Sequence, residues 1–307
     1  MKAVVYERYG EPEVLQLVQL AKPIPKDNEV LIRVRATTVT IGDVRMRSFT
    51  VPPGEWLFAR LYLGVFKPRR AILGMELCGD IEAVGSKVTR FKVGDAVFAS
   101  TFGADFGGYA EYKCLPETGL LARKPSNLSY VEAAAAVGAG VVALRCLRKA
   151  QIQRGQKVLI YGASGAVGTN AVQLARNHFG AHVTGVCSTA NLELVRSLGA
   201  EEVIDYTRED FTAAGAVYDV VFDAVAKFPA QRAKTALKPN GVYLNVHRDT
   251  HPDGSQAAVD ELVELKGLIE ARTLKPVIDR CYPLEAIVEA HHYVGTGHKK
   301  GNVAITL

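Results

Sequence analysis

The fold is decided by the stretch Lys157-Val158-Leu159-Ile160-Tyr161-Gly162-Ala163-Ser164-Gly165-Ala166-Val167-Gly168. Its first five residues form an apolar run that predicts a buried strand, and the residues from Ala166 to about Arg176 predict a helix. Small residues in the turn between them let a backbone approach a pyrophosphate, and the helix N-terminus offers free N–H groups and the positive end of the helix dipole. The stretch therefore predicts a dinucleotide site rather than a tight structural turn alone.

The spacing of the glycines is G-x-x-G-x-x-G, which departs from G-x-G-x-x-G in its first interval. Because the motif follows a strand and opens a helix, we still interpret it as a nucleotide-binding turn. The residues that we expect to contribute to it are Gly162, Ser164, Gly165, Ala166, Val167 and Gly168.

The residues after this turn alternate between strand and helix patterns. Strands are predicted at 182–187, 201–205, 218–224 and 241–246, and helices at 190–198, 229–237 and 259–271. Such alternation is typical of an α/β fold, a doubly wound parallel sheet with helices on both faces. Residues 2–123 instead show short strands separated by Gly and Pro, and 302–306 predicts a strand that returns to this β domain. We therefore predict two domains, 1–124 with 272–307 and 125–271.

The nucleotide that binds is indicated by the strand after the turn. NAD sites place an Asp or Glu about 20 residues beyond the glycines, but Ser188 stands twenty residues after Gly168 and no acid precedes Glu193. A carboxylate about 4 Å from a 2′-phosphate would cost about 4 kcal/mol at an effective dielectric of 20. Its absence favours NADP(H) over NAD(H), although residues 183–195 hold no Arg or Lys. Ser188 and Thr189 are also suited to cap the helix that follows.

Composition narrows the possible partners. The 307 residues include 48% hydrophobic and 22% charged side chains, and the net charge is +5. The charges are spread through both halves, so we predict no nucleic-acid binding. No uninterrupted run of 18 apolar residues and no secretory signal occur, which predicts no transmembrane helix and a cytoplasmic protein. Five widely spaced cysteines predict reduced thiols rather than disulfides.

Metal binding is disfavoured by the positions of the histidines. The first 177 residues contain no His, so a zinc site there would need Cys, Asp and Glu alone. Adjacent helical residues point about 100° apart, so His291 and His292 are unsuited to share one metal. We expect both to be solvated or capping residues, and we predict no metal site.

The segment 47–73 interleaves apolar and basic residues. It contains Trp56, Phe58 and Phe66, and basic residues from Arg47 to Arg70. Three interpretations stay open: a lid over an apolar pocket, a surface for a membrane or partner, and a loop with a short helix packed on the domain's own core.

Together these motifs resemble the medium-chain dehydrogenase/reductase superfamily, and most of all its zinc-independent quinone oxidoreductase and enone reductase branch. The resemblance covers nearly the whole chain. Besides the glycine turn, it rests on the stretches 41–45, 73–79, 84–85, 91–97, 107–112, 198–200, 205–206 and 297–303. It implies a GroES-like β domain, a Rossmann domain and a cleft between them.

The resemblance also implies the chemistry. In the zinc alcohol dehydrogenases of this superfamily, catalytic Cys and His ligands stand at the positions of Thr40 and Met75, and neither of these side chains holds zinc well. The resemblance therefore implies direct hydride transfer from NADPH to a small apolar quinone or α,β-unsaturated carbonyl. A nucleotide-binding redox sensor or partner-binding module with little catalysis is the alternative.

Several residues acquire expected roles through the resemblance. Thr40, Asp43 and Arg45 match the substrate cleft, although Asp43 and Arg45 are equally suited to a buried ion pair or a solvated turn. The residues that match cofactor-contacting segments are Ser188, Asn191, Tyr206, Asp223, Ala224, Val225, Asn245 and Asn302. The family usually has a further strand after Val246, used at a dimer interface, and the segment 247–258 shows no strand pattern here. A truncated sheet is expected, and a homodimer stays open.

Overall fold

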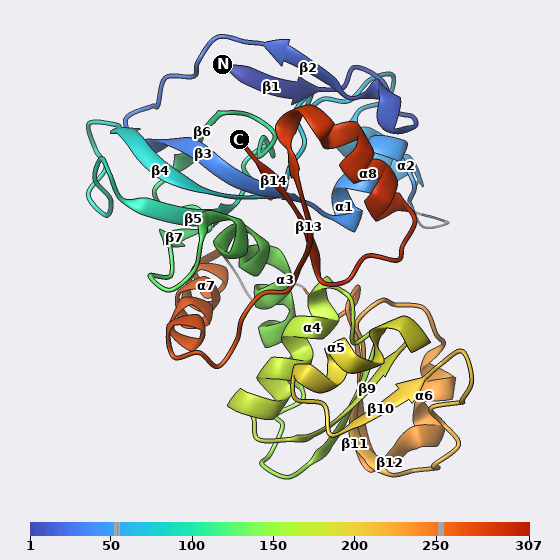
Figure 1. Cartoon of the computed structure of the whole chain (residues 1–307). Helices are drawn as coiled ribbons and strands as arrows, with labels where there is room; N and C mark the ends of the chain where they lie inside the picture. Colours follow the sequence, from blue (N-terminus) through green and yellow to red (C-terminus); the bar gives the residue numbers. More distant parts are fainter. Residues whose placement is uncertain (52–53, 55, 251–254) are drawn as a thin grey trace. The chain divides into compact units, whose positions relative to one another are not determined.

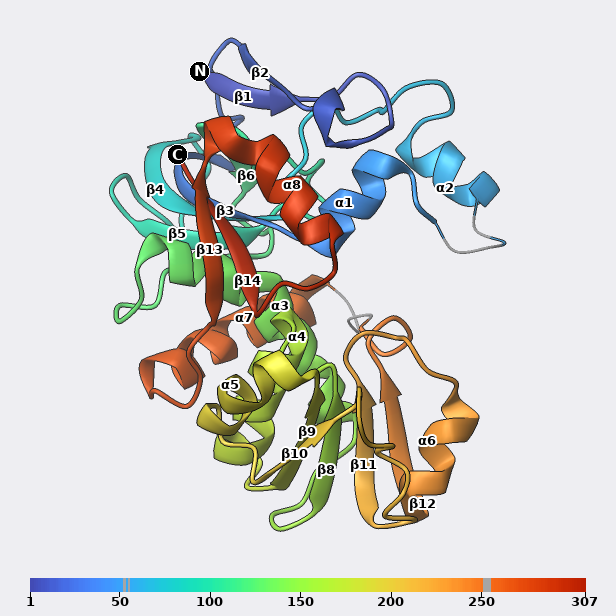
Figure 2. The ribbon, with the colours of Figure 1, turned by 45° about the vertical axis from the view of Figure 1, so that its right-hand side comes forward.

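A computed structural model describes residues 1–51, 54, 56–250 and 255–307 of the chain (Figures 1 and 2). It divides into two compact units. Unit 1 comprises Met1–Gly138 and Ile278–Leu307, and unit 2 comprises Ala139–Val277. The domain limits expected from the sequence remain a prediction.

Unit 2 is built on a five-stranded sheet in which all described pairs are parallel, in the order β10-β9-β8-β11-β12. This order reverses direction beside β8, as in a Rossmann sheet. Its elements are α3 (Tyr130–Lys149, which begins in unit 1), β8 (Lys157–Tyr161), α4 (Ala166–Gln173), η2 (Leu174–His178), β9 (His182–Cys187), η3 (Thr189–Asn191), α5 (Leu192–Ser197), β10 (Glu202–Asp205), β11 (Tyr218–Asp223), α6 (Ala230–Ala236), β12 (Leu237–Asn245) and α7 (Ser255–Glu270).

Helices cover both faces of this sheet. Ala233 of α6 packs in one core cluster with Leu159 of β8. Val195 of α5 lies against Gly185, which pairs with Ile160. Since successive residues of a strand point to opposite faces, α6 and α5 lie on opposite sides of the sheet. The doubly wound α/β prediction is confirmed.

Unit 1 contains a seven-stranded sheet, in which β3 joins β14, β4 and β6, and a separate pair, β1 and β2. Helix α8 lies against α1, η1 and β14, and its Ile287 and Val294 belong to a buried apolar cluster. The elements are β1 (Lys2–Val5), η1 (Pro12–Val14), β2 (Gln16–Gln19), β3 (Glu29–Val39), α1 (Ile41–Ser48), α2 (Trp56–Leu63), β4 (Glu76–Val84), β5 (Ala96–Ser100), β6 (Tyr112–Pro116), β7 (Leu121–Arg123), β13 (Ile278–Pro283), η4 (Leu284–Ala286), α8 (Ile287–Gly295) and β14 (Asn302–Thr306).

Helix α3 departs from the sequence expectation. Among the described residues, it alone is long and apolar enough, by length and composition, to cross a membrane, with a mean hydropathy of 1.5 over its best window. The helix contains no uninterrupted run of 18 apolar residues, because Glu132 and Arg145 lie within it. About 67% of that window is buried, which is the behaviour of a core helix.

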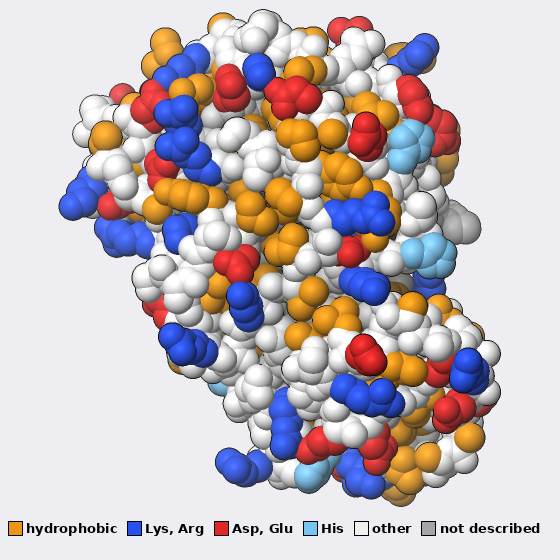
Figure 3. All heavy atoms as spheres, viewed as in Figure 1, with side chains coloured by type: hydrophobic (Ala, Val, Ile, Leu, Met, Phe, Trp, Pro, Cys, Tyr) orange, Lys and Arg blue, Asp and Glu red, His pale blue; other side chains and the backbone are white. Residues whose placement is uncertain are grey.

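Two further expectations, for the histidine pair and for the segment 47–73, are met only in part. His291 is fully buried, not solvated, whereas His292 is exposed and lies 2.6 Å from Glu13. Of the three interpretations of the segment 47–73, packing on the domain's own core holds in part: α2 has no fully buried residue, but its Leu63 packs against a buried apolar cluster of unit 1. The expected strandless segment 247–258 falls partly on residues 251–254, outside the described residues. Figure 3 shows charges of both signs interspersed on the face in view.

Candidate cofactor and substrate site

The glycine turn of unit 2 is held close to the sheet by two of its glycines. Gly162 has φ +77°, and a Cβ there would lie 2.6 Å from Val225 Cγ1. A Cβ on Gly168 would clash with the Gly162 carbonyl oxygen and lie 2.8 Å from Ala163 Cα. Because backbone atoms cannot move aside as a flexible side chain can, only glycine lets α4 pack this closely on the turn.

The third glycine faces open space instead. A Cβ on Gly165 would meet only the Gly162 carbonyl oxygen, at 3.4 Å. Gly165 is also the N-cap residue of α4, and no side chain caps this helix in the described part of the chain. The first-turn N–H groups, including those of Ala166 and Val167, thus lie at a helix N-terminus suited to a diphosphate. The geometry of the turn fits the cofactor that the sequence implies.

Asn191 joins the turn to the end of β9. Its Nδ2 donates to Ser164 Oγ at 3.0 Å and to Ser188 Oγ at 3.2 Å. Its Oδ1 is buried without a partner among the described residues. The structure therefore brings three predicted site residues together and leaves one polar atom unused there, as expected where a ligand completes the hydrogen bonding.

The end of β10 lies beside this group. Asp205 pairs with Cys187 in the sheet register, and its Oδ2 accepts from Thr189 Oγ1 at 2.5 Å. The next residue, Tyr206, is half exposed, and its ring lies 6.1 Å from that of Tyr161. Tyr206 is thus at the same edge of the sheet as Ser188.

Sequence reasoning missed one cation at this edge. Arg208 follows Tyr206 and is exposed, with its Nε 3.7 Å from Asp205 Oδ2. No Arg or Lys lies within 183–195, but the register between β9 and β10 brings Arg208 to the same edge of the sheet. That register is a tertiary property, so no local pattern in the sequence pointed to Arg208.

The remaining predicted residues of unit 2 end the strands on the other side of β8. Asp223 pairs with both Tyr161 and Asn245, so these three strand ends are level. The buried Asp223 carboxylate accepts from Val225 N at 3.1 Å, and Ala224 N donates to Tyr161 O at 3.1 Å. Burial raises the pKa of Asp223. These contacts shape the turn after β11 at the edge where ligands bind in such sheets.

The candidate substrate residues belong to unit 1. Thr40 caps α1: its Oγ1 accepts from Asp43 N, and Asp43 Oδ2 in turn accepts from Thr40 N at 2.9 Å and Thr40 Oγ1 at 2.6 Å. Asp43 Oδ1 accepts from Gly74 N at 3.0 Å. Asp43 is fully buried, and burial raises its pKa to about 6. Its oxygens are engaged by the chain itself, and its role toward a substrate stays a prediction.

A buried chain of hydrogen bonds joins Arg47, His291 and Tyr109. Arg47 Nε donates to His291 Nδ1 at 3.3 Å, so the neutral ring carries its proton on Nε2 and donates to Tyr109 Oη, 3.2 Å away. Tyr109 also lies near Asp43, whose pKa burial raises and Tyr109 lowers to a smaller extent. Burial lowers the pKa of His291 to about 3, consistent with a neutral ring. Tyr109 is a core residue, and the chain links the buried Arg47 to it through His291.

Thr40 and Met75 are neighbours, with Oγ1 and Sδ 3.6 Å apart. The structure thus brings together the two positions that carry zinc ligands in the zinc enzymes, as a hydroxyl and a thioether. Within the described residues, no group of three or more His, Cys, Asp and Glu side chains is arranged to hold a metal ion.

Glu76, the residue after Met75, is a buried carboxyl that sequence reasoning missed. Its Oε2 accepts from Thr38 Oγ1 at 2.8 Å and its Oε1 from Gly138 N at 3.0 Å. Burial raises its pKa to about 7, against a smaller lowering effect from Lys299. An alternating strand pattern predicts apolar side chains on the inward face, so it does not predict a buried carboxyl there.

The other two predicted residues of unit 1 differ in setting. Asn302 is buried at the start of β14, and because Val303 pairs with Val39, it lies next to Thr40 in the sheet. Arg45 is exposed on α1. The structure therefore groups Thr40, Asp43 and Asn302, and leaves Arg45 at the surface.

Family models match both parts of the chain. The alcohol dehydrogenase GroES-like domain matches residues 26–126, and models described as zinc-binding dehydrogenase match 166–262 and 250–305. The combination defines a two-domain dehydrogenase architecture.

Relatives narrow the class. A 2-methylene-furan-3-one reductase of Solanum lycopersicum is 34% identical, over 99% of this chain and 79% of its own length. A quinone oxidoreductase of Homo sapiens is 31% identical, over 96% and 94%. The solved quinone oxidoreductase of Coxiella burnetii has a TM-score of 0.88 at 29% identity, covering 100% of this chain and 99% of that one. The chain therefore belongs to the medium-chain dehydrogenase/reductase superfamily, in its quinone oxidoreductase-like branch, and is an oxidoreductase.

Proposed function

We propose that this protein reduces quinones or α,β-unsaturated carbonyls with NADPH, by direct hydride transfer and without zinc. The observation that carries the proposal is the helix N-terminus at Gly165, which lies open and without a side-chain cap at the carboxyl edge of the parallel sheet. A relative from Arabidopsis thaliana, 33% identical, is named NADPH-dependent alkenal/one oxidoreductase, which supports both cofactor and substrate class.

When bound, the dinucleotide would supply the hydride. The residues of this chain would hold its diphosphate at the N–H groups of 165–167, with Gly162 and Gly168 keeping α4 close to the turn. Positioning of donor and acceptor is the main contribution required of the protein, since conjugation already makes quinones and enones electrophilic.

The preference for NADPH is supported by Asn191. If its amide is turned over, Ser164 and Ser188 donate to Oδ1, and the two N–H bonds of Nδ2 become available to a 2′-phosphate. Either orientation satisfies both serines. Arg208 adds a positive charge at the same edge, and the position that usually carries a carboxylate is Ser188.

Zinc independence is supported by the side chains at the two ligand positions. A threonine hydroxyl and a methionine thioether are poor zinc ligands compared with thiolate and imidazole. The Thr40 hydroxyl is also engaged with Asp43. We therefore expect the proton that completes enone reduction to come from solvent.

Binding is tested with Gly165→Asp, which places a carboxylate where the diphosphate would lie. A Cβ fits at this position, so the variant should fold. NADPH titration, followed by cofactor fluorescence, should show at least a hundredfold weaker binding. The matched control is Gly267→Asp on α7, where nothing lies within 4 Å and binding should stay unchanged. Equal affinity in both variants would contradict the assigned turn.

Catalysis is tested with NADPH deuterated at nicotinamide C4 and a panel of quinones and enals. Deuterium at the β-carbon of a reduced enal demonstrates direct hydride transfer. Stoichiometric zinc in active protein would contradict zinc independence. Cofactor binding without turnover on the whole panel would instead favour the redox sensor or partner-binding module.

A further inference from the structure

We propose that unit 1 carries a docking surface for anionic lipid bilayers, formed by α2 and the residues that follow it. The apolar part, here called the α2 patch, consists of Trp56, Leu57, Phe58, Leu61, Tyr62, Val65 and Phe66. The α2 patch belongs to unit 1 and the cofactor turn to unit 2, and the test of the patch does not depend on the proposed activity.

The α2 patch is unusually exposed. Seven of the fifteen exposed large apolar side chains among the described residues fall within 56–66, and Phe58 and Phe66 are 73% and 95% exposed. Single exposed apolar residues are ordinary, but a contiguous exposed cluster marks a surface that binds something.

Helix α2 turns its charged side chain inward and its apolar side chains outward, the reverse of an ordinary surface helix. Its charged residue, Arg60, faces inward: its guanidinium carbon lies 3.8 Å from the Phe49 ring centroid and 5.0 Å from that of Tyr9. Leu57 and Leu61, one helical turn apart, are 66% and 54% exposed, and the Phe58 and Tyr62 rings stack at 6.5 Å. A helix that hides its cation and exposes its apolar side chains is suited to an apolar surrounding.

The inward face also fixes α2 to unit 1. Leu63 packs against the buried cluster that contains Tyr6 and Leu73, and Tyr9 Oη donates to Gly64 O at 3.1 Å. Arg60 Nη1 donates to Val65 O at 3.2 Å, which ties the residues after the helix to it. The apolar side chains are thereby presented on an anchored element.

The stretch that carries the α2 patch is basic, although Glu55 precedes it in the sequence and Asp105 pairs with Arg70. Residues 56–75 include Arg60, Lys67, Arg69 and Arg70 and no Asp or Glu. Lys67 and Arg69 are exposed, and Arg70 pairs with Asp105 at 2.7 Å. Aromatic side chains next to cations are the combination that binds the interface of anionic membranes, with the rings in the headgroup region.

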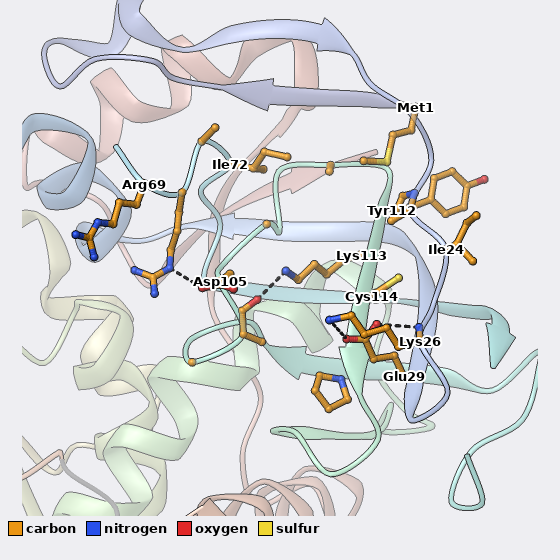
Figure 4. Close-up of a pocket in the computed structure, with 18 of the residues that line it drawn as sticks. Met1, Ile24, Lys26, Glu29, Arg69, Ile72, Asp105, Tyr112, Lys113 and Cys114 are labelled. Carbon is orange, nitrogen blue, oxygen red and sulfur yellow. Dashed lines mark hydrogen bonds and ion pairs between the residues drawn. The ribbon is translucent and has the colours of Figure 1, made fainter. Parts of the chain in front are cut away.

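A cavity of about 900 Å³ is lined by Tyr62 of α2 and by Arg69 and Arg70, which follow the helix. Figure 4 shows Arg69, Asp105 and Lys113 around this cavity. Its wall also carries Lys26 and Lys113, against the two acids Glu29 and Asp105. Lys113 Nζ donates to Ala104 O at 2.7 Å. A surplus of cations in a concave wall suits a phosphate group, which a lipid headgroup supplies.

A second copy of the chain fits this surface less well. A symmetric pair would place the same patch against itself, so that the cations of each copy face those of the other. Like charges brought together oppose association, whereas an anionic bilayer neutralises them. We therefore assign the surface to a bilayer.

The single tryptophan of the chain, Trp56, reports on docking directly. Full-length protein is mixed with vesicles of phosphatidylcholine and phosphatidylglycerol in a 3:1 ratio, and with vesicles of phosphatidylcholine alone. On the anionic vesicles we expect a blue shift of Trp56 emission and co-sedimentation that weakens with added salt. Absence of binding to the anionic vesicles at low salt would overturn the proposal.

Two variants locate the surface, each checked for an unchanged thermal midpoint. Phe58→Ser with Phe66→Ser should lower vesicle partitioning at least tenfold, because each substitution removes an aromatic ring that docking would bury in the bilayer. Lys67→Gln with Arg69→Gln should lower it by about 30-fold, since each cation near an anionic surface contributes about a factor of five. Val93→Ser, at a side chain 59% exposed elsewhere in unit 1, is the control and should bind as the parent does.

Two results identify another occupant. A Trp56 shift that depends on protein concentration without vesicles, together with a larger sedimentation coefficient, would assign the patch to a second copy. A shift caused by quinone or NADPH and unaffected by vesicles would assign it to the substrate. Either result overturns the bilayer proposal.

Discussion

Helices α1 and α4 both begin at the end of a strand, yet their N-termini are completed differently. In unit 1, Thr40 and Asp43 form a reciprocal capping box at the start of α1. In unit 2, α4 begins at Gly165 with no side-chain cap in the described structure. Since a helix leaves its first N–H groups without intrahelical partners, the first helix satisfies them internally and the second leaves them for a ligand.

The difference separates the two groups of predicted residues by how completely the chain itself satisfies their hydrogen bonds. Asp43 accepts hydrogen bonds from Thr40 and Gly74, so its carboxylate is part of the fold. The first N–H groups of α4 have no side-chain cap, and Asn191 Oδ1 has no hydrogen-bond partner among the described residues. The predictions below test this contrast.

The largest effect is expected for Asp43→Ala. The change leaves Thr40 Oγ1 and Gly74 N without the carboxylate that accepts their hydrogen bonds. We expect a loss of about 3 to 5 kcal/mol in the free energy of unfolding, measured by urea titration. NADPH affinity of the folded variant should stay unchanged, because unit 2 holds the turn. A loss below about 1 kcal/mol would break the contrast.

Gly168→Ala tests close packing in unit 2. The added methyl group meets the Gly162 carbonyl and Ala163, which are backbone atoms, so we expect about 2 to 3 kcal/mol of destabilisation together with weaker NADPH binding. In the control Gly267→Ala, the methyl group meets nothing within 4 Å on α7. The control should gain up to about 1 kcal/mol from helix propensity. Equal stabilities would show that α4 does not need glycine here.

Glu76→Gln tests the buried carboxyl through its pH dependence. Its pKa is raised to about 7 in the folded chain from an ordinary value of 4.5, so the folded state holds a proton that the unfolded state has lost between these values. The free energy of unfolding therefore falls as pH rises through this range. Relative to the parent, the variant should gain on the order of 2 kcal/mol between pH 4.5 and pH 8.

The measurement is urea unfolding of both proteins across this pH range. Asp43, with its pKa raised to about 6, and His291, with its pKa lowered to about 3, titrate in both proteins. The contribution of His291 cancels in the difference, and Asp43 contributes only through its charge interaction with Glu76. A difference that does not vary with pH would mean that Glu76 is ionised in the fold throughout.

The smallest effect is expected for Arg208→Gln. Removal of an exposed cation at the edge of the nucleotide site should raise the KM for NADPH about three- to tenfold, and leave that for NADH unchanged. Arg154→Gln is the control, because Arg154 precedes β8 at the opposite edge of the sheet. An equal change for both nucleotides would remove Arg208 from 2′-phosphate recognition.

The parts of the fold that the sequence predicted depend on local periodicity. Strands 157–161 and 182–187 and the glycine turn are continuous in the chain, so neighbouring residues determine them, and the observed strands have these bounds. The C-terminal strand 302–306 was predicted from the same kind of pattern.

The features that were missed depend on contacts between distant residues. His291 is buried because Arg47 and Tyr109, far away in the chain, surround it. Arg208 reaches the nucleotide edge only through the pairing of β10 with β9. Burial of an ionisable group and the register of strands are tertiary properties, and a single sequence does not display them.

Unit 1 closes its large sheet with β13 and β14, which follow the whole of unit 2 in the chain. On the ribosome, β3 therefore emerges long before the strand that pairs with it on that side. Unit 2 is continuous and can fold as soon as residue 277 has left the exit tunnel, whereas the edge of β3 stays unpaired until residues 302–306 arrive. During synthesis that strand edge is the part of the molecule most in need of a chaperone.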